Sequence, residues 1–227
     1  MPQVLVPIDV PPYRLSGVVY GTLLNHRTAW QSLGDAVNQP PYDGAPKAPV
    51  LYVKPQNTLA AGGDPVHVPP GAMELEIGAC LGLVIGRAAC RLEELSALNY
   101  LAGYLIVNDV SVPHQPYYRP SIRSRARDGF CPIGPRVIPG AAVPDPDNLN
   151  IRVFIDGELI QQATTSQLVR PVRKLLADVT EFMTLSPGDV LAVGAAAPAP
   201  RVRAGQRARI EIDGLGHLEN AFVQESA

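Results

Sequence analysis

Dispersed proline is the sequence feature that most constrains the fold of this chain. The 24 prolines are spread along all 227 residues together with 20 glycines, so they do not form a low-complexity linker. Short apolar runs such as Cys80–Ile85 and Val190–Val193 lie between them. Runs of this length, bounded by proline and glycine, are typical of buried strands joined by tight, irregular loops.

The periodicity of apolar residues predicts more strands than helices. We expect strands at Arg14–Tyr20, Val50–Val53, Cys80–Ile85, Tyr104–Asp109, Phe130–Ile138, Ile151–Ile155, Val190–Val193, Ala208–Ile212 and His217–Val223. Asp156-Gly157 predicts a hairpin turn after one of them. Apolar residues at helical spacing predict two helices, one over Leu92–Ala102 and one over Leu168–Met183.

The order of these elements indicates the fold class. Strands do not alternate regularly with helices, which argues against a doubly wound parallel sheet. We therefore expect an α+β fold, a β-rich mixed sandwich or roll with a few short helices. No shift in composition divides the chain, so residues 1–227 are expected to form one domain.

Charge and composition exclude several classes of protein. The net charge is −2 and only 18% of residues are charged, which argues against a nucleic-acid-binding protein. The apolar runs are too short to span a membrane, and the proline-rich start does not fit a signal peptide. Cys80, Cys90 and Cys131 show no CxxC pairing, so we expect reduced thiols in a cytoplasmic protein.

Common catalytic motifs are missing from the sequence. There is no GxGxxG, GxxxxGK[ST], HExxH or GxSxG pattern. The four histidines are scattered, which is more typical of surface or capping residues than of metal ligands.

Several segments in a fixed order resemble the fumarylacetoacetate hydrolase family. They are Leu81–Gly86 (LGLVIG), Gly103–Ser111 (GYLIVNDVS), Arg125–Gly134 (RARDGFCPIG), Pro187–Gly194 (PGDVLAVG) and Ile212–Leu218 (IDGLGHL). Gly21–Arg27 (GTLLNHR) and Tyr117–Arg127 (YYRPSIRSRAR) are similar to one branch of it. That branch is the bifunctional isomerase/decarboxylases of homoprotocatechuate degradation, and the likeness is to their amino-terminal half. The resemblance implies the family's β-sandwich roll.

The resemblance also implies a metal site and shows where this chain departs from it. The family acts on enolisable oxo-acids and uses magnesium or another divalent cation to stabilise negative charge on oxygen. An E-x-E pair on one strand and an Asp on the next hold the ion. Here Gly78 and Cys80 occupy the two glutamate positions, and Asp109 matches the third ligand. One carboxylate is a poor magnesium site, so we expect no tightly bound metal, with Asp109 as the ligand if one binds at all.

Two alternatives stay open around this site. A real E-x-E, Glu74-Leu75-Glu76, lies four residues before the family's position. We expect it to be a solvated strand entry, and its use as a substitute pair of ligands is the alternative. Asp109 itself also fits a strand-end residue that caps a turn.

Other family positions have changed as well. Many members carry N-Y-x-x-H-x-x-E on a lid helix, but Ala29 and Ser32 stand where the proton-handling His and Glu would be. The family lysine of K-x-x-D is Arg125, which keeps its charge but cannot exchange its proton near neutral pH. The family's late G-T-P is Gly194-Ala195-Ala196, which lacks the hydroxyl.

The residues that remain in the expected pocket are mostly cationic and polar. We assign Asp109 and Arg125 as candidate catalytic residues. The candidate substrate-binding residues are Asn25, Tyr118, Arg119 and Arg123, with Tyr117 beside them. A multiply charged oxo-acid is the ligand that such a set favours. Loop packing and surface charge are the alternative explanation for the Tyr-Tyr-Arg cluster.

Two functional hypotheses follow. In the first, the chain is a subunit of a 2-hydroxyhepta-2,4-diene-1,7-dioate isomerase or 5-oxopent-3-ene-1,2,5-tricarboxylate decarboxylase type of enzyme, with an eroded metal site. In the second, it is a non-catalytic structural or regulatory paralogue that assembles with a metal-bearing chain. Both imply a homodimer or a heteromer.

Overall fold

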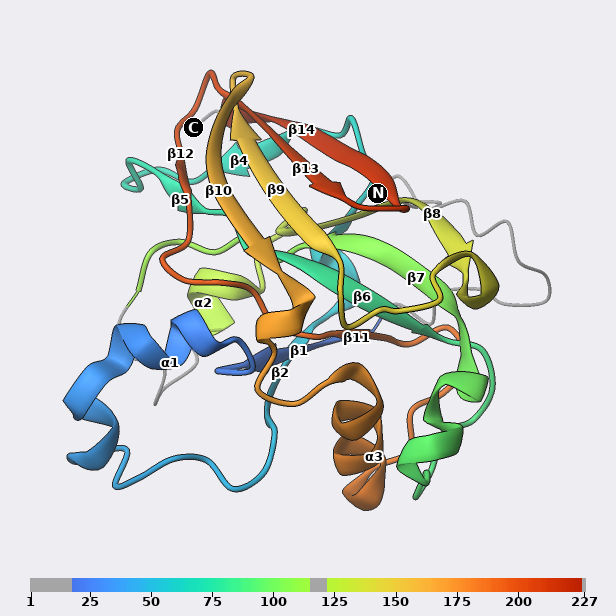
Figure 1. The fold of residues 1–227 in the computed structure, drawn as a ribbon. Coiled ribbons are helices and arrows are strands. Elements are labelled where there is room, and N and C mark those ends of the chain that lie inside the picture. Colours follow the sequence, from blue (N-terminus) through green and yellow to red (C-terminus); the bar gives the residue numbers. More distant parts are fainter. Residues whose placement is uncertain (1–17, 115–121, 226–227) are drawn as a thin grey trace.

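The computed structural model describes residues 18–114 and 122–225, and strands dominate it (Figure 1). Seven strands form the larger sheet, in the spatial order β2-β1-β11-β6-β7-β8-β3. Their bounds are β1 Val19–Leu23, β2 Val50–Lys54, β3 Leu59–Ala60, β6 Ala79–Ile85, β7 Leu101–Asn108, β8 Cys131–Pro139 and β11 Val190–Ala192. The β1/β11 and β3/β8 pairs are parallel and the others are antiparallel, so the sheet is mixed.

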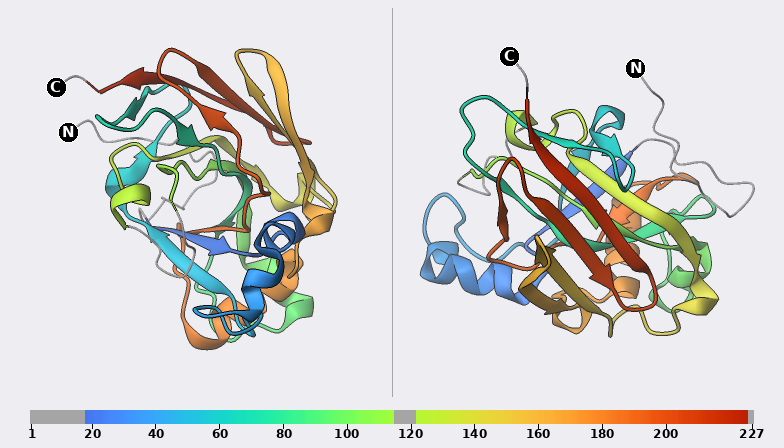
Figure 2. Two further views of the ribbon diagram at one scale, coloured as in Figure 1. Left: turned by 90° about the vertical axis from the view of Figure 1, so that its left-hand side faces the viewer. Right: turned by 90° about the horizontal axis from the view of Figure 1, so that it is seen from above.

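A five-stranded sheet in the order β10-β9-β13-β14-β4 lies over one face of the larger sheet (Figures 1 and 2). Its strands are β4 Val66–Val68, β9 Asn150–Ile155, β10 Glu158–Thr164, β13 Arg207–Ile212 and β14 Gly216–Gln224. Asp156 and Gly157 both have positive φ, 50° and 87°, which confirms the predicted two-residue hairpin turn between β9 and β10. The short strands β5 Leu75–Glu76 and β12 Arg201–Val202 pair separately.

Helices are few and short in the described parts of the chain, and the α+β prediction is confirmed. They are α1 Arg27–Leu33, α2 Ile122–Arg125 and α3 Val172–Phe182, with 3₁₀ turns at Gly34–Asn38, Gln56–Thr58, Glu94–Tyr100, Gly140–Ala142 and Thr165–Gln167. α3 lies within the predicted Leu168–Met183 and buries Val172, Leu175, Leu176 and Val179 along one face.

Two sequence expectations need correction or fall partly outside the described residues. An α-helix over Leu92–Ala102 is wrong, because Glu94–Tyr100 forms a 3₁₀ turn and β7 already begins at Leu101. Leu95 of that turn is 89% exposed, so the apolar spacing does not mark a buried helical face. The strand predicted at Arg14–Tyr20 begins at Val19 within the described residues.

The wholly buried strand β6 divides the interior into two sides. Because successive side chains of a strand point to opposite faces, Leu81 and Leu83 join the main core between the two sheets. Cys80 and Val84 face the other side, where Val107 and Cys131 pack with them. The family's metal-ligand positions belong to this second side, so the arrangement of β6 and β7 there defines the candidate site.

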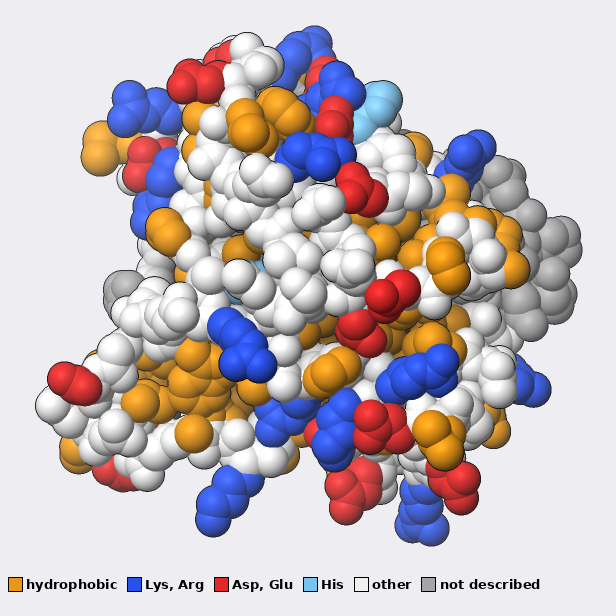
Figure 3. Space-filling model, viewed as in Figure 1, with side chains coloured by type: hydrophobic (Ala, Val, Ile, Leu, Met, Phe, Trp, Pro, Cys, Tyr) orange, Lys and Arg blue, Asp and Glu red, His pale blue; other side chains and the backbone are white. Residues whose placement is uncertain are grey.

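The surface seen in Figure 3 mixes charges of both signs, with apolar side chains gathered beside α1. Three buried residues, Leu23, Leu24 and Ala29, form the small cluster under that helix, with Trp30 and Leu33 packed against it. No helix in residues 18–114 or 122–225 is long and apolar enough to cross a bilayer.

Candidate functional site

Asp109 follows the last residue of β7 and lies against the start of β6. Its backbone N–H donates to the Gly78 carbonyl at 2.9 Å, which continues the β6/β7 pairing. The residue is 8% exposed. A buried carboxylate is costly unless its charge is balanced, so its partners determine what the site can do.

Two cations and a phenol balance the Asp109 carboxylate. Lys54 Nζ lies 2.8 Å from Oδ1, and Arg125 Nη1 donates to Oδ2 at 2.7 Å. The Tyr52 hydroxyl also donates to Oδ2. Burial by itself would raise the pKa of Asp109, but the charges of Lys54 and Arg125 outweigh it and hold that pKa below its ordinary value. Asp109 is therefore an ionised carboxylate with both oxygens engaged.

Tyr52 fills the space between Asp109 and β1. Its ring lies under the Arg125 guanidinium, with 4.7 Å from the guanidinium carbon to the ring centroid. A side chain at Gly21 would occupy the same volume as this ring, so glycine is needed there. Burial, followed by the charge of Asp109, raises the pKa of Tyr52, which keeps the phenol protonated as a donor.

The E-x-E positions of the family supply no carboxylate here. A Cβ at position 78 would lie 2.5 Å from the Asp109 carbonyl oxygen, so the backbones approach where only glycine fits. Cys80 is buried, and burial together with nearby Asp109 raises the pKa of its thiol. The one carboxylate left at these family positions is that of Asp109, and it pairs with two cations, Lys54 and Arg125.

Glu74 and Glu76 form ion pairs with residues other than Lys54 and Arg125, although the charge of Glu76 also contributes, after that of Asp109, to raising the pKa of Arg125. Arg201 pairs with both, at 3.1 Å to Glu74 and 3.0 Å to Glu76. Arg203 lies 3.7 Å from Glu74, and the Ser111 hydroxyl donates to Glu76 at 3.1 Å. These contacts place the E-L-E motif in a partly solvated ion-pair cluster on β5 and β12.

The side chain of the candidate binding residue Asn25 is hydrogen-bonded within the protein. Its side-chain amide donates to the carbonyls of Val193 at 2.9 Å and Arg170 at 3.2 Å, and its Oδ1 accepts from the Arg170 N–H at 2.9 Å. Asn25 is 1% exposed. Both amide hydrogens are thus used by the protein itself, and contact with a ligand stays a prediction.

The lid positions carry no proton-transfer group. Ala29 and Ser32 lie on α1, and the Ser32 hydroxyl donates to the Ala29 carbonyl at 2.8 Å. Arg123 lies exposed on α2, two residues before Arg125. Tyr117, Tyr118 and Arg119 lie outside the described residues.

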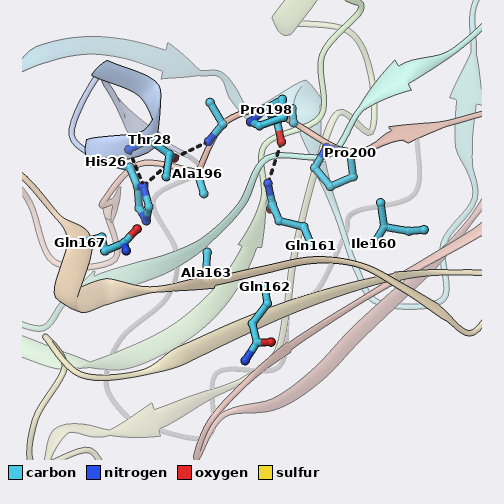
Figure 4. A pocket seen from close by; sticks show the side chains of 12 residues that line it. His26, Thr28, Ile160, Gln161, Gln162, Ala163, Gln167, Ala196, Pro198 and Pro200 are labelled. Carbon is cyan, nitrogen blue, oxygen red and sulfur yellow. Dashed lines mark hydrogen bonds between the residues drawn. The ribbon is translucent and has the colours of Figure 1, made fainter. Parts of the chain in front are cut away.

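A groove of about 430 Å³ lies apart from Asp109, between α1, β10 and residues 196–200 (Figure 4). His26 is the one ionisable side chain among its described lining residues. The Gln161 amide donates across it to the Pro198 carbonyl at 2.7 Å, and Thr28 Oγ1 accepts from the Ala197 N–H at 2.8 Å. Burial lowers the pKa of His26, which caps α1, so this ring is neutral near pH 7.

Sequence reasoning missed Tyr52, Lys54 and His114. Lys54 ends an apolar strand directly before Pro55, an unusual place for a charged residue and the one available signal. His114 Nδ1 is 2.8 Å from the Val112 carbonyl, and its Nε2 accepts from Arg125 Nε at 3.4 Å. Histidine thus holds the far side of the same guanidinium that binds Asp109.

Comparisons with known proteins define the family. A model described as "Fumarylacetoacetate (FAA) hydrolase C-terminal" matches residues 18–223, and the chain belongs to the fumarylacetoacetate hydrolase family. The chain is 39% identical over 211 residues to a "4-hydroxyphenylacetate degradation bifunctional isomerase/decarboxylase" of Salmonella dublin. That match covers 93% of this chain and 48% of the other, so the chain spans about half the length of this relative.

Solved structures agree with this assignment. A 5-carboxymethyl-2-hydroxymuconate delta-isomerase from Mycobacterium smegmatis superposes with a TM-score of 0.81 at 27% identity, covering 99% of this chain and 83% of that one. A maleylpyruvate hydrolase from Sphingobium sp. SYK-6, solved with manganese(II) and pyruvate, has a TM-score of 0.75 at 27% identity, covering 92% and 71%.

The divalent ion of such relatives does not fit the residues of this chain. Asp109 has both oxygens in ion pairs, and positions 78 and 80 bring a glycine and a protonated thiol. No three His, Cys, Asp or Glu side chains form a group that could hold a metal in the described parts of the chain. Hard divalent cations need several oxygen ligands, which this donor set does not provide.

Proposed function

We propose that this chain is a subunit or half-module of an isomerase/decarboxylase of aromatic catabolism. Its substrate class would be the open-chain oxo-acids formed by homoprotocatechuate ring cleavage, as in 2-hydroxyhepta-2,4-diene-1,7-dioate isomerisation and 5-oxopent-3-ene-1,2,5-tricarboxylate decarboxylation. The family membership and the named Salmonella relative support this assignment. The proposal treats residues 1–227 as one domain.

The Lys54–Asp109–Arg125 ion pairs carry the second part of the proposal, that this pocket works without a metal. Decarboxylation leaves an enolate, and a positive group must stabilise its oxygen as charge develops. Arg125 offers fixed charge but cannot pass a proton to carbon, and Ala29 and Ser32 cannot do so in its place. The chain alone would therefore have little activity, and a metal-bearing paralogous chain would perform the chemistry.

Turnover measurements test whether the chemistry needs the metal-bearing paralogous chain. The pure chain is assayed with and without added magnesium, then again after mixing with an E-x-E-bearing family member, whose own rate is the reference. We expect the pure chain to be more than tenfold slower than that reference, a barrier difference above about 1.4 kcal/mol. Turnover within tenfold would refute the non-catalytic role, and its loss in Arg125→Ala would then indicate an arginine-based site.

Metal binding is tested separately from turnover. Titration of the wild-type chain with magnesium or manganese should give no saturable heat and no rise in melting temperature. Saturable binding tighter than about 1 mM would contradict the proposed absence of a metal site.

Assembly is the remaining part of the proposal. We expect a dimer or larger species, either homotypic or with the metal-bearing paralogue, located in the cytoplasm, where the three cysteines would remain as the free thiols they are in the structure. Light scattering of the pure chain should report more than the 24.2 kDa of one copy. A clean monomer at high micromolar concentration would eliminate the homodimer and leave the heteromer.

A further inference from the structure

Lys54 is a charged side chain placed almost entirely out of solvent. It is 1% exposed, whereas Lys47 is exposed and the Lys174 side chain is 50% exposed. The sequence contains only these three lysines. An ammonium group is costly to bury unless all of its hydrogens find acceptors and its charge is balanced, so its surroundings need an explanation.

Four oxygen atoms surround the Lys54 ammonium. The carbonyl oxygens of Val110, Arg125 and Phe130 accept from Nζ at 2.7, 2.7 and 2.8 Å. Asp109 Oδ1 lies 2.8 Å away. The three carbonyls account for the three ammonium hydrogens, so the Asp109 contact is an ion pair and not a well-directed hydrogen bond. We call these four oxygens the oxygen cage.

The oxygen cage joins Lys54 to three parts of the chain that lie more than fifty residues further along the sequence. Asp109 and Val110 follow β7, Arg125 ends α2, and Phe130 directly precedes β8. Lys54 reaches them from the last position of β2. One carboxylate and three neutral carbonyls complement one positive charge, and the cage contains the main chain of the residue whose guanidinium binds Asp109.

We propose that the oxygen cage is a binding site for a single ammonium-type cation, which Lys54 fills from within the chain. Its occupancy positions Arg125, because Nζ holds the Arg125 carbonyl while the Arg125 guanidinium pairs with Asp109. Lys54 is thus a positioning residue. The inference rests on the proposed metal-free pocket for its functional meaning, but the geometry of the cage stands without it.

Selective labelling tests the cage in the unmodified protein. Incorporation of ¹⁵N-lysine labels three ammonium groups, and a cationic Lys54 with three hydrogen bonds should give one slowly exchanging –NH₃⁺ signal at neutral pH. Lys47 and Lys174 serve as internal controls because solvent reaches both. A neutral amine signal for Lys54, or exchange as fast as that of Lys47, would overturn the proposal.

Substitution with chemical rescue tests whether the site is selective for an ammonium cation. Lys54→Ala should lower the melting temperature by about 10 °C, and Lys47→Ala should leave it unchanged. Added propylammonium should restore most of the loss by entering the vacated cage. Tetramethylammonium at equal ionic strength should not, because it has the charge but no N–H. Equal rescue by both salts would contradict a site for an ammonium donor.

A third variant separates positioning from packing. Lys54→Met keeps most of the side-chain volume and removes the charge, and we expect it to shift the Arg125 Nε–H signal. An unchanged Arg125 signal would refute the positioning role. If neither variant folds, the labelled wild-type chain decides the question. Magnesium binding to the wild-type chain would refute the metal-free pocket while leaving the Lys54 signal intact, so the two failures are distinguishable.

Discussion

Two short segments of this chain, four residues apart, each have one of the two features of the family's E-x-E motif, its carboxylates or its position. Glu74-Leu75-Glu76 has the carboxylates of an E-x-E pair, and Gly78-Ala79-Cys80 has its position beside Asp109. The first lies in a partly solvated cluster with Arg201. The second lies at the start of the wholly buried strand β6, with Gly78 against the Asp109 backbone. The structure therefore separates the paired carboxylates from the position beside Asp109 that they would occupy in the family's motif.

The two regions also differ in how their charges are balanced. Around Asp109 the ion pairs are buried, with Lys54 1% and Arg125 11% exposed at the side chain. Around Glu74 and Glu76 the partner Arg201 is 45% exposed. Removing one member of a buried pair leaves an uncompensated charge, whereas water compensates at the surface. Removing one charge should therefore lower the free energy of unfolding more around Asp109 than around Glu74 and Glu76.

The largest effect is expected for Asp109→Asn. This change leaves Lys54 and Arg125 without their shared carboxylate inside the protein, so we expect the free energy of unfolding to fall by about 3–5 kcal/mol. Denaturant unfolding measures it, with the exposed Asp35→Asn as the control. A loss below about 1 kcal/mol would mean that the buried cluster behaves like a surface pair.

Acid should also destabilise the buried cluster, because it protonates the Asp109 carboxylate. The pKa of Asp109 is lowered in the folded chain, so its stabilisation is fully present above the unfolded-state value of about 3.9 and is lost as pH falls through the folded pKa. We expect wild-type stability to drop steeply below about pH 4 and Asp109→Asn to show a shallower drop. Unfolding free energies measured between about pH 2 and 6 test this, and parallel curves would contradict it.

Gly78→Ala should have an intermediate effect. The added Cβ would lie 2.5 Å from the Asp109 carbonyl oxygen, and neither backbone can move without disturbing the β6/β7 pairing. We expect a loss of about 1–3 kcal/mol from overpacking. Gly140→Ala is the matched control, because its nearest heavy atom is 4.0 Å from the new Cβ. Equal stability of both variants would show that the close approach of the backbones at Gly78 does not exclude a side chain such as the family's glutamate.

The fold was largely predictable from local pattern. The buried runs in β6, β7 and β11, the Asp156-Gly157 turn and helix α3 follow from apolar periodicity and turn chemistry, which act over a few residues. The α-helix predicted near Leu92 is wrong because its apolar spacing does not mark a buried face, Leu95 being exposed, and the segment forms a 3₁₀ turn before β7. The order of strands depends on contacts between distant segments, and local pattern does not encode it.

The candidate site was predictable only in part. The resemblance directed attention to Asp109 and Arg125, which the structure brings together at 2.7 Å. Tyr52 and Lys54 stand more than fifty residues away in sequence, and their relation to Asp109 arises only when β2 joins the sheet through β1. The hydrogen bonds of Asn25 to Val193 and Arg170 could not be predicted either, because the sequence gives the residue type and not its partners.

The smallest effect is expected for Glu74→Gln and Glu76→Gln. Each substitution removes one charge from a cluster that water reaches, and Arg201 keeps the other glutamate as a partner. We expect a loss of about 0.2–1 kcal/mol for each, further reduced at high salt. Denaturant unfolding at low and high ionic strength measures this, and magnesium titration of the same variants should match that of the wild-type chain. A loss near that of Asp109→Asn, or a difference in magnesium binding, would show that the displaced E-x-E pair acts in the site after all.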